Sequence, residues 1–455
     1  MKNLSLKNIA KACNGKLYNC DGIENVLVSD VVIDSRKVTE GCLFIPIKGA
    51  RVDGHDFIPQ VLADGAVCVL SQYRLDTDKP YIQVLSTTQA LMDIAAFYRQ
   101  SLDIKVIGIT GSVGKTSTKE MIASVLEEKF KVLKTEGNFN NEIGLPLTIF
   151  RLREEHQIAV LEMGISHFGD MEKLAVIAKP DICVITNIGM CHLENLSNRN
   201  GVLKAKTEMF KFMSDNGSII LNGDDDKLIT IDEYKGIKPI FYGMNKEFAL
   251  YGENVMSLGL KGTFFTVNFM NGEGLEIYVR IPGKHMVYNS MAAAAVGEVL
   301  GMNPDEIKKG IEKIRTVKGR NNVVETKHLT IIDDCYNANP VSTKAAIDVL
   351  TYAHGRKVAI LGDMFELGSE EIQMHREVGE YAAEKNVDLL ICIGKLSKNT
   401  YDAAMEKGIK KAVYYKTKEE FLEKPEEVLQ KSDNILVKAS HGMEFPEVVN
   451  KLLKM

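Results

Sequence analysis

The residues with the clearest chemical meaning lie in a glycine-rich stretch, VIGITGSVGKTSTKEM, at positions 106–121. A Walker A loop has Gly, four residues and then Gly-Lys-[Ser/Thr], whereas this chain has Ile109 at the first of those positions. The glycines that remain, Gly111 and Gly114, permit unusual backbone angles and a close ligand approach. An apolar run precedes them and a helical pattern starts at Lys115, so N–H groups of a helix N-terminus would face a polyphosphate. The stretch predicts a nucleotide site of the form TGxxGKT.

Within this loop each residue type has an expected role. Lys115 would neutralise charge on the β- and γ-phosphates, and the Thr116 hydroxyl would bind Mg²⁺. The predicted nucleotide contacts are consecutive in the chain: Thr110, Gly111, Ser112, Val113, Gly114, Lys115, Thr116 and Ser117.

A carboxylate follows the next apolar strand. Glu162 comes directly after IAVL, and ligands of open α/β sheets bind at the carboxyl ends of strands. Because Mg²⁺ at a phosphate loop usually takes a further carboxylate, Glu162 is a candidate metal ligand. The alternative is a solvated glutamate at a strand end.

Three other polar features permit two interpretations. Asn138, Asn140 and Asn141 in GNFNNEIG form either a polar turn or a ligand contact, since amides both donate and accept hydrogen bonds. His192 follows the strand ICVITNIG, and a lone histidine is more often structural than a ligand. Lys204 and Lys206 look by composition like a solvated basic face, because an ammonium repels Mg²⁺.

The elements that must position these residues fall into three blocks. Residues 1–103 mix short strands and helices, residues 104–315 alternate apolar strands with amphipathic helices, and residues 316–455 contain a second such series with strands LTIIDD, KVAILGD, DLLICIG and NILVKAS. Apolar strands with helices between them predict parallel, doubly wound sheets. We expect three α/β domains: a small N-terminal one, a central P-loop-type parallel-sheet ATPase domain and a Rossmann-like C-terminal one.

Composition excludes several classes of function. With 455 residues and a net charge of −5, nothing in the charge balance favours nucleic acid or an anionic membrane surface. No segment has the pattern of a signal peptide or a spanning helix. The 8 cysteines are scattered without a CxxC pair, which is typical of buried thiols in a reducing compartment. We expect a cytoplasmic protein, and a monomer.

Taken together, these motifs resemble the Mur ligases, ATP-dependent enzymes that extend the peptide of the peptidoglycan precursor. The resemblance covers essentially the whole chain, and the motifs that carry it are TGSVGKTS, TEGNFNNEIGLPLT, LEMG, TNIGMCHLE, AKTE, GKHMVYNSMAAAA, VKGR, IDDCYNANP and LGDMFELG. The last two look most like the branch that adds D-alanyl-D-alanine, and the segment VVIDSRKVTEGCLFIPIKGARVDGHDFI resembles its uridine-diphosphate-binding domain.

The resemblance implies roles that spacing alone does not assign. It implies ATP and two Mg²⁺ ions, with Glu162, His192 and a carbamylated Lys206 joining Thr116 at the metals. Carbamylation converts the cation into a carboxylate-like anion, which reverses the solvated-face interpretation of Lys206. Lys115, His192 and Lys206 become the expected catalytic residues. Asn289 and Arg320 match nucleotide contacts, and Asp334 matches a ribose contact.

The implied substrates are UDP-N-acetylmuramoyl-tripeptide and D-alanyl-D-alanine. Their expected contacts come from the first and third domains and from the asparagine cluster: Ser35, Arg36, Asn138, Asn140, Asn141, Tyr336, Asn337 and Asn339. Whether the third peptide residue is lysine or diaminopimelate stays open. The alternatives are another Mur ligase, a folylpolyglutamate-synthetase-like ligase, or a P-loop ATPase that switches conformation without ligating anything.

The chain departs from the family at one place. Near the C-terminus this branch commonly has Lys-Gly-Ser-Arg, whereas here the sequence is VKASHGMEF, with Lys438, Ala439 and His441. Histidine lacks the permanent charge and the five-donor fork of arginine, so an anion contact is not carried over to this position.

Overall fold

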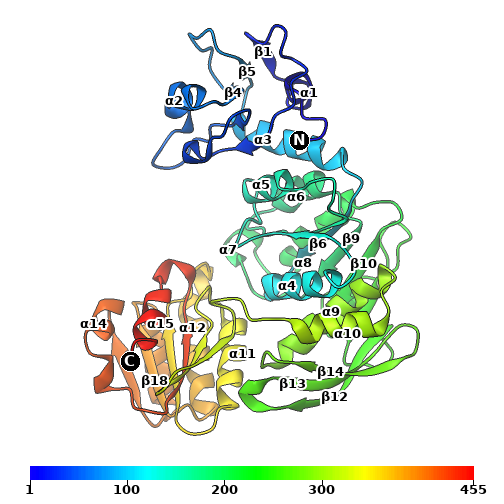
Figure 1. Ribbon diagram of the computed structural model, residues 1–455. Coiled ribbons are helices and arrows are strands. Elements are labelled where there is room, and N and C mark those ends of the chain that lie inside the picture. Colours follow the sequence, from blue (N-terminus) through cyan, green and yellow to red (C-terminus); the bar gives the residue numbers. More distant parts are fainter.

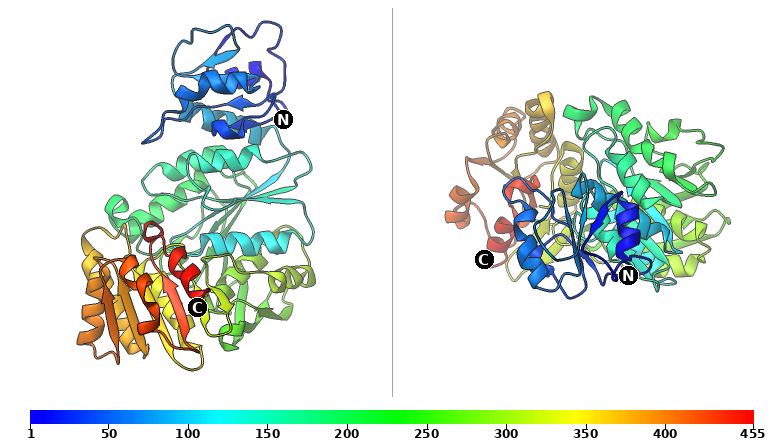
Figure 2. Two further views of the ribbon diagram at one scale, coloured as in Figure 1. Left: turned by 60° about the vertical axis from the view of Figure 1, so that its left-hand side comes forward. Right: turned by 90° about the horizontal axis from the view of Figure 1, so that it is seen from above.

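The computed structural model describes residues 1–455 and consists of three α/β bodies, each built on its own sheet (Figure 1). The N-terminal and C-terminal bodies both adjoin the central one, on different sides of it (Figures 1 and 2). The three sheets lie within the three predicted blocks, and the predicted boundaries fall in connections between elements. The α/β fold class is therefore confirmed.

The N-terminal body has short strands, as the sequence predicts. Its sheet has the order β1-β5-β4-β3-β2, in which only the pair β1–β5 is antiparallel. Its elements are α1 (Leu6–Ala12), β1 (Lys16–Tyr18), β2 (Val31–Val32), β3 (Leu43–Phe44), α2 (Ile58–Ala63), β4 (Cys68–Ser71), β5 (Tyr81–Gln83) and α3 (Thr87–Gln100).

The central body carries the phosphate loop on a nine-stranded sheet of order β14-β13-β12-β11-β10-β9-β6-β8-β7. Its strands are β6 (Lys105–Thr110), β7 (Val132–Lys134), β8 (Ile158–Glu162), β9 (Ile182–Ile185), β10 (Ser218–Asn222), β11 (Ile240–Gly243), β12 (Leu250–Ser257), β13 (Thr263–Asn268) and β14 (Gly274–Val279). Its helices are α4 (Lys115–Leu126), α5 (Gly144–Phe150), α6 (Asp170–Ala178), α7 (Leu193–Leu196), α8 (Arg199–Thr207), α9 (Lys284–Val299) and α10 (Pro304–Lys313).

The predicted parallel arrangement holds from β7 to β12 in this sheet. The sheet then continues with two antiparallel strands, β13 and β14, which the sequence analysis did not anticipate. Burial alternates residue by residue along β13, and this pattern is typical of an antiparallel strand with one solvated face. The site therefore lies in the parallel part, where β8 and β9 flank β6.

The C-terminal body has a six-stranded sheet of order β15-β16-β20-β17-β18-β19, parallel except for the edge pair β15–β16. Its elements are β15 (Asn322–Glu325), β16 (Thr330–Asp333), α11 (Pro340–Thr351), β17 (Lys357–Gly362), α12 (Glu371–Glu384), β18 (Leu389–Ile393), α13 (Ser397–Glu406), β19 (Ala412–Tyr415), α14 (Lys418–Glu423), β20 (Asn434–Lys438) and α15 (Pro446–Leu452). The four strands predicted here are β16, β17, β18 and β20.

Two further expectations concern the cysteines and the membrane. All eight cysteines are free thiols, and seven of them are buried, as their dispersal predicts; the exception is Cys191, which is half-buried. None of the helices combines the length and the apolar character needed to cross a bilayer.

Candidate functional site

The phosphate loop has the strand–loop–helix geometry that the sequence predicts, since β6 ends at Thr110 and α4 begins at Lys115. Gly114 is the residue that precedes the helix, with φ of +84° in the left-handed region that favours glycine. A side chain at Gly111 would place its Cβ 1.9 Å from Thr186 Oγ1. Both glycines are therefore required, and the first N–H groups of α4 have no intrahelical acceptor.

Two residues at the end of the neighbouring strand β9 hold this loop. The Asn187 side chain accepts from the Val113 N–H (3.0 Å) and donates to the Val113 carbonyl (2.9 Å), which also accepts from Thr186 Oγ1 (2.7 Å). Ser112 Oγ accepts from the Gly189 N–H at 2.8 Å. Thr186 and Asn187 were missed in the sequence, although they follow an apolar strand as Glu162 does.

A cluster of lysine and histidine side chains lies beside the phosphate loop. Lys115 Nζ donates to the Gly111 carbonyl at 2.9 Å. Lys206, on α8, is only 1% exposed, whereas Lys204 on the same helix is exposed. Burial first, and then the Lys115 ammonium, lower the pKa of Lys206 to about 7. The solvated-face interpretation is therefore right for Lys204 and wrong for Lys206.

His192 is electrostatically part of the same cluster. Burial first, and then the charges of Lys206 and Lys115, lower its pKa to about 4, so the imidazole is neutral at pH 7. A neutral imidazole is the form that binds metals. His192 precedes α7 and has φ of +50°.

Glu162 ends β8 and is 2% exposed, which excludes the solvated alternative. Its Oε1 accepts from Asn140 Nδ2 at 2.9 Å, and its N–H donates to Thr135 Oγ1 at 3.0 Å. Its Oε2 is buried without any hydrogen-bond partner. A buried carboxylate oxygen without a donor is costly, and a hard cation such as Mg²⁺ would satisfy it. The donor types of Glu162 and Thr116 therefore fit Mg²⁺, although no three His, Cys, Asp or Glu side chains form a ready metal cluster.

The C-terminal body reaches the phosphate loop through Arg320. Its Nη2 lies 3.4 Å from Thr116 Oγ1, and its guanidinium stacks over the Tyr336 ring at 4.0 Å. From α9, Asn289 Oδ1 accepts from Thr118 Oγ1 at 3.0 Å. The structure thus brings Asn289 and Arg320 to α4.

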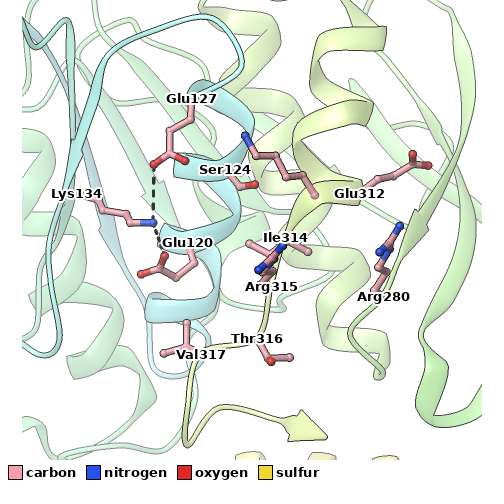
Figure 3. Close-up of a pocket in the computed structure, with 11 residues that line it drawn as sticks. Glu120, Ser124, Glu127, Lys134, Arg280, Glu312, Ile314, Arg315, Thr316 and Val317 are labelled. Atoms are coloured by element: carbon pink, nitrogen blue, oxygen red, sulfur yellow. Dashed lines mark hydrogen bonds and ion pairs between the residues drawn. The ribbon is translucent and has the colours of Figure 1, made fainter. Parts of the chain in front are cut away.

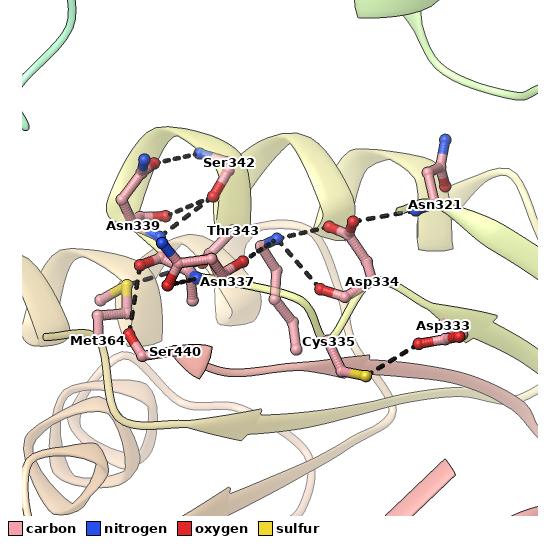
Figure 4. A network of polar contacts seen from close by, with 12 residues as sticks. Asn321, Asp333, Asp334, Cys335, Asn337, Asn339, Ser342, Thr343, Met364 and Ser440 are labelled. Atoms are coloured by element: carbon pink, nitrogen blue, oxygen red, sulfur yellow. Dashed lines mark hydrogen bonds and ion pairs between the residues drawn. The ribbon is translucent and has the colours of Figure 1, made fainter. Parts of the chain in front are cut away.

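Asp334 is the centre of a polar network in the C-terminal body (Figure 4). One carboxylate oxygen accepts from the Asn321 N–H at 3.0 Å, and the other pairs with Lys438 Nζ at 2.5 Å. Lys438 is 3% exposed and also donates to the Asn337 carbonyl at 3.0 Å. Lys438 therefore holds the Asp334 side chain in place. The centroid of the His441 ring lies 5.3 Å from the centroid of the Tyr336 ring.

The predicted asparagines have different partners in the structure. Asn140 contacts Glu162, but Asn141 Oδ1 accepts from Gly144 N at the start of α5, and Asn138 is exposed. Asn339 caps α11 by accepting from Ser342 N at 2.8 Å. In the same region, Asn337 Oδ1 accepts from Ala338 N at 2.9 Å.

Ser35 and Arg36 lie in a short 3₁₀ helix, η1 (Ser35–Lys37), of the N-terminal body, apart from the phosphate loop (Figure 1). Arg36 is exposed and donates twice to the Asp34 carboxylate, at 2.9 and 2.8 Å.

A cavity of about 590 Å³ lies on another face of α4 (Figure 3). It is lined by Glu120 and Ser124, by Arg280 and by the connection Ile314–Val317, and contains no predicted site residue. In it Lys134 pairs with Glu120 at 2.6 Å. Because its charges are largely paired or solvated, we assign the functional site to the phosphate loop instead.

Comparison with known proteins matches the three bodies to three families. The descriptions are Mur ligase family, catalytic domain (residues 28–99), Mur ligase middle domain (109–297) and Mur ligase, glutamate ligase domain (319–441). The chain is 38% identical over 459 residues to the UDP-N-acetylmuramoyl-tripeptide–D-alanyl-D-alanine ligase of Bacillus subtilis (strain 168), covering 99% of this chain and 98% of the relative.

Solved structures agree with these matches. A crystal structure of MurF from Acinetobacter baumannii has a TM-score of 0.90 and 31% identity, with 99% of each chain covered. MurF ligase from Thermotoga maritima in complex with ADP has a TM-score of 0.84 and 29% identity, covering 93% of this chain and 97% of that one. By sequence along its whole length and by fold, the chain belongs to the Mur ligase family.

Proposed function

We propose that this chain is an ATP-dependent ligase that joins D-alanyl-D-alanine to the carboxylate of UDP-N-acetylmuramoyl-tripeptide, forming the pentapeptide precursor of peptidoglycan. The named relative that matches nearly the whole chain supports the choice of substrates. The chemistry is supported above all by one observation: a lysine buried beside the phosphate loop, Lys206, has no carboxylate partner and a depressed pKa.

The first step activates the tripeptide carboxylate, which is a poor electrophile. The γ-phosphoryl group of ATP passes to a carboxylate oxygen, ADP leaves, and an acyl phosphate forms. The Lys115 ammonium and the N–H groups at the start of α4 stabilise charge on the transferring group. Because these groups act on the phosphates without bonding covalently to them, catalysis is mainly positioning and charge stabilisation.

The second step forms the amide bond. The free amine of D-alanyl-D-alanine attacks the acyl carbon, the C–O bond to phosphate breaks, and the proton from nitrogen leaves with the departing phosphate. Arg320 and Asp334 belong to the C-terminal body and would enclose the nucleotide between that body and the central one. Exclusion of water there protects the acyl phosphate from hydrolysis.

We propose that two Mg²⁺ ions are held by Thr116, Glu162, His192 and a carbamylated Lys206. Bound Mg²⁺ would supply Lewis-acid stabilisation of phosphate oxygens. A pKa of about 7 leaves much of the Lys206 amine neutral at physiological pH, and the neutral amine is the form that adds CO₂. The product is an anion and would suit a divalent cation, which would also satisfy Glu162 Oε2, an oxygen that is buried without a hydrogen-bond partner.

Phosphate release from ATP, measured with each substrate omitted in turn, tests the proposal. We expect release only when UDP-muramoyl tripeptide and D-alanyl-D-alanine are both present. Running the assay with the lysine and the diaminopimelate tripeptides identifies the third residue. Assays with single amino acids in place of the dipeptide are the control for the alternative that the chain is another Mur ligase. Phosphate release that does not depend on D-alanyl-D-alanine would refute the proposal.

We also propose that the protein acts as a monomer in the cytoplasm. The loop, Glu162 and the Arg320 contact all come from one chain, so the site needs no second copy. Sedimentation velocity at working concentration is expected to show a single 50.5 kDa species.

A further inference from the structure

A contact between two bodies of the molecule involves His192 and a residue with no assigned role, Glu366. His192 Nδ1 lies 3.2 Å from Glu366 Oε2. His192 belongs to the central body, whereas Glu366 lies in the C-terminal body, between β17 and the 3₁₀ helix η6 (Gly368–Glu370). An imidazole nitrogen at this distance from a carboxylate can donate its hydrogen after a small reorientation.

Backbone geometry marks both residues as held in place. Glu366 has φ of +63° and His192 φ of +50°, and neither is a glycine. Non-glycine residues in this region cost free energy and persist where the surroundings impose them, often at functional sites. Exposed residues such as Lys235 and Glu444 adopt the same conformation elsewhere in the chain, but here two such residues face each other across a domain boundary.

The loop that carries Glu366 is fixed on both sides. The Met364 N–H donates to His375 Nε2 at 3.0 Å, and the Phe365 N–H donates to Ser440 Oγ at 2.8 Å. Beyond Glu366, Gly368 lies so close to α7 that an added Cβ would be 3.6 Å from Glu194 N. These contacts therefore place the Glu366 carboxylate at the start of α7.

From the opposite side, α7 docks onto the C-terminal body. The Leu193 side chain packs against the buried apolar cluster of that body. The residue that immediately precedes Leu193 is His192, so the same docking fixes where the imidazole lies. The two bodies thus meet at the histidine from both directions.

We propose that Glu366 is a positioning residue for His192: it accepts the Nδ1 hydrogen across the domain boundary and leaves Nε2 to bind the metal. This inference rests on the proposed function, because it assumes the metal role of His192. A carboxylate on the second ring nitrogen fixes the tautomer and raises the basicity of the metal-binding nitrogen. Metal affinity is thereby coupled to docking of the C-terminal body.

Binding of Mn²⁺ to the full-length protein, followed by EPR in the presence of bicarbonate, tests this inference. Removing a partner of this kind typically weakens metal binding by about 10-fold to 100-fold, and we expect this range for Glu366→Gly. Glycine suits the positive φ, so backbone strain cannot explain the loss. Glu366→Gln should lose less Mn²⁺ affinity than Glu366→Gly, since its amide oxygen still accepts a hydrogen bond. The control is Glu370→Gln, an exposed glutamate of the same segment, which should bind as the unsubstituted protein does.

A double-mutant cycle separates positioning through His192 from an independent effect. In a His192→Ala background, Glu366→Gly should cause no further loss of Mn²⁺ affinity. Unchanged binding in Glu366→Gly alone, or additive losses in the double variant, would overturn the role of Glu366. If His192→Ala by itself binds Mn²⁺ normally, then the metal assignment in the proposed function fails instead.

Discussion

At the scale of single residues, Lys206 shows how environment changes chemistry. The same side chain type two positions earlier, Lys204, is exposed, whereas Lys206 lies buried near Lys115. Desolvation and a like charge both disfavour the ammonium form. The buried amine is thereby available for reaction with CO₂, whereas Lys204 stays an ordinary solvated cation.

Replacement of this lysine is expected to remove most activity. Lys206→Ala should nearly abolish ligation, because the anion that would help to hold Mg²⁺ is lost, and a short carboxylate such as acetate should restore part of it. Turnover at saturating substrates, with and without acetate, measures both effects. The matched control is Lys204→Ala, for which we expect normal turnover; a Lys206→Ala enzyme with normal turnover would remove this residue from the mechanism.

The pH dependence of carbamylation follows from the same pKa. A lysine with a pKa of about 7 is mostly protonated and unreactive at pH 6, and mostly neutral at pH 8. CO₂-depleted enzyme given the same dissolved CO₂ should regain activity roughly ten times faster at pH 8 than at pH 6. Equal rates at the two pH values would contradict this account.

At the scale of elements, three neighbouring strands place the residues of the site together at their carboxyl ends. The strand β6 leads into the phosphate loop, β8 ends at Glu162, and β9 leads to Thr186 and Asn187. The strand–loop–helix unit was predictable, because its glycines and apolar run are local features. The role of Thr186 and Asn187 was not, because it depends on β9 pairing with β6, and nothing in the sequence specifies that adjacency.

The contact between loop and strand end gives a test at this scale. Gly111→Ala would force Cβ against Thr186 Oγ1, so the loop must move. Such overpacking costs about 1–3 kcal/mol, and we expect ATP binding weaker by roughly 10-fold or more, measured by titration calorimetry. Gly236→Ala is the control: it also places alanine at a positive φ (+81°), but its Cβ meets nothing within 4 Å, so only the contact with Thr186 distinguishes the two variants. Equal ATP affinity in both variants would argue against the tight clamp.

At the scale of the whole molecule, the phosphate loop belongs to the central body, whereas Arg320 and Asp334 belong to the C-terminal body. The order of the bodies and their α/β nature could be predicted, because strand and helix patterns are local in sequence. The contact of Arg320 with Thr116 could not be derived from spacing, since the two residues are 204 positions apart. Only the resemblance to the Mur ligases pointed to Arg320 as a nucleotide contact.

Asp334 provides the test at this scale. Asp334→Ala should raise the KM for ATP, and it should also destabilise the protein, because it leaves the buried Lys438 ammonium unpaired. Breaking a buried pair costs about 3–5 kcal/mol. The double variant Asp334→Ala/Lys438→Met should recover thermal stability but not the KM. A double variant with the original KM would show that Asp334 acts only through folding.

The bonds that Thr186 and Asn187 make to Val113 have a thermodynamic consequence. Because these bonds come from the protein itself and restrain the loop, little conformational entropy is left to lose there when the phosphates arrive. The entropy change measured on nucleotide binding should accordingly contain little contribution from ordering of the loop.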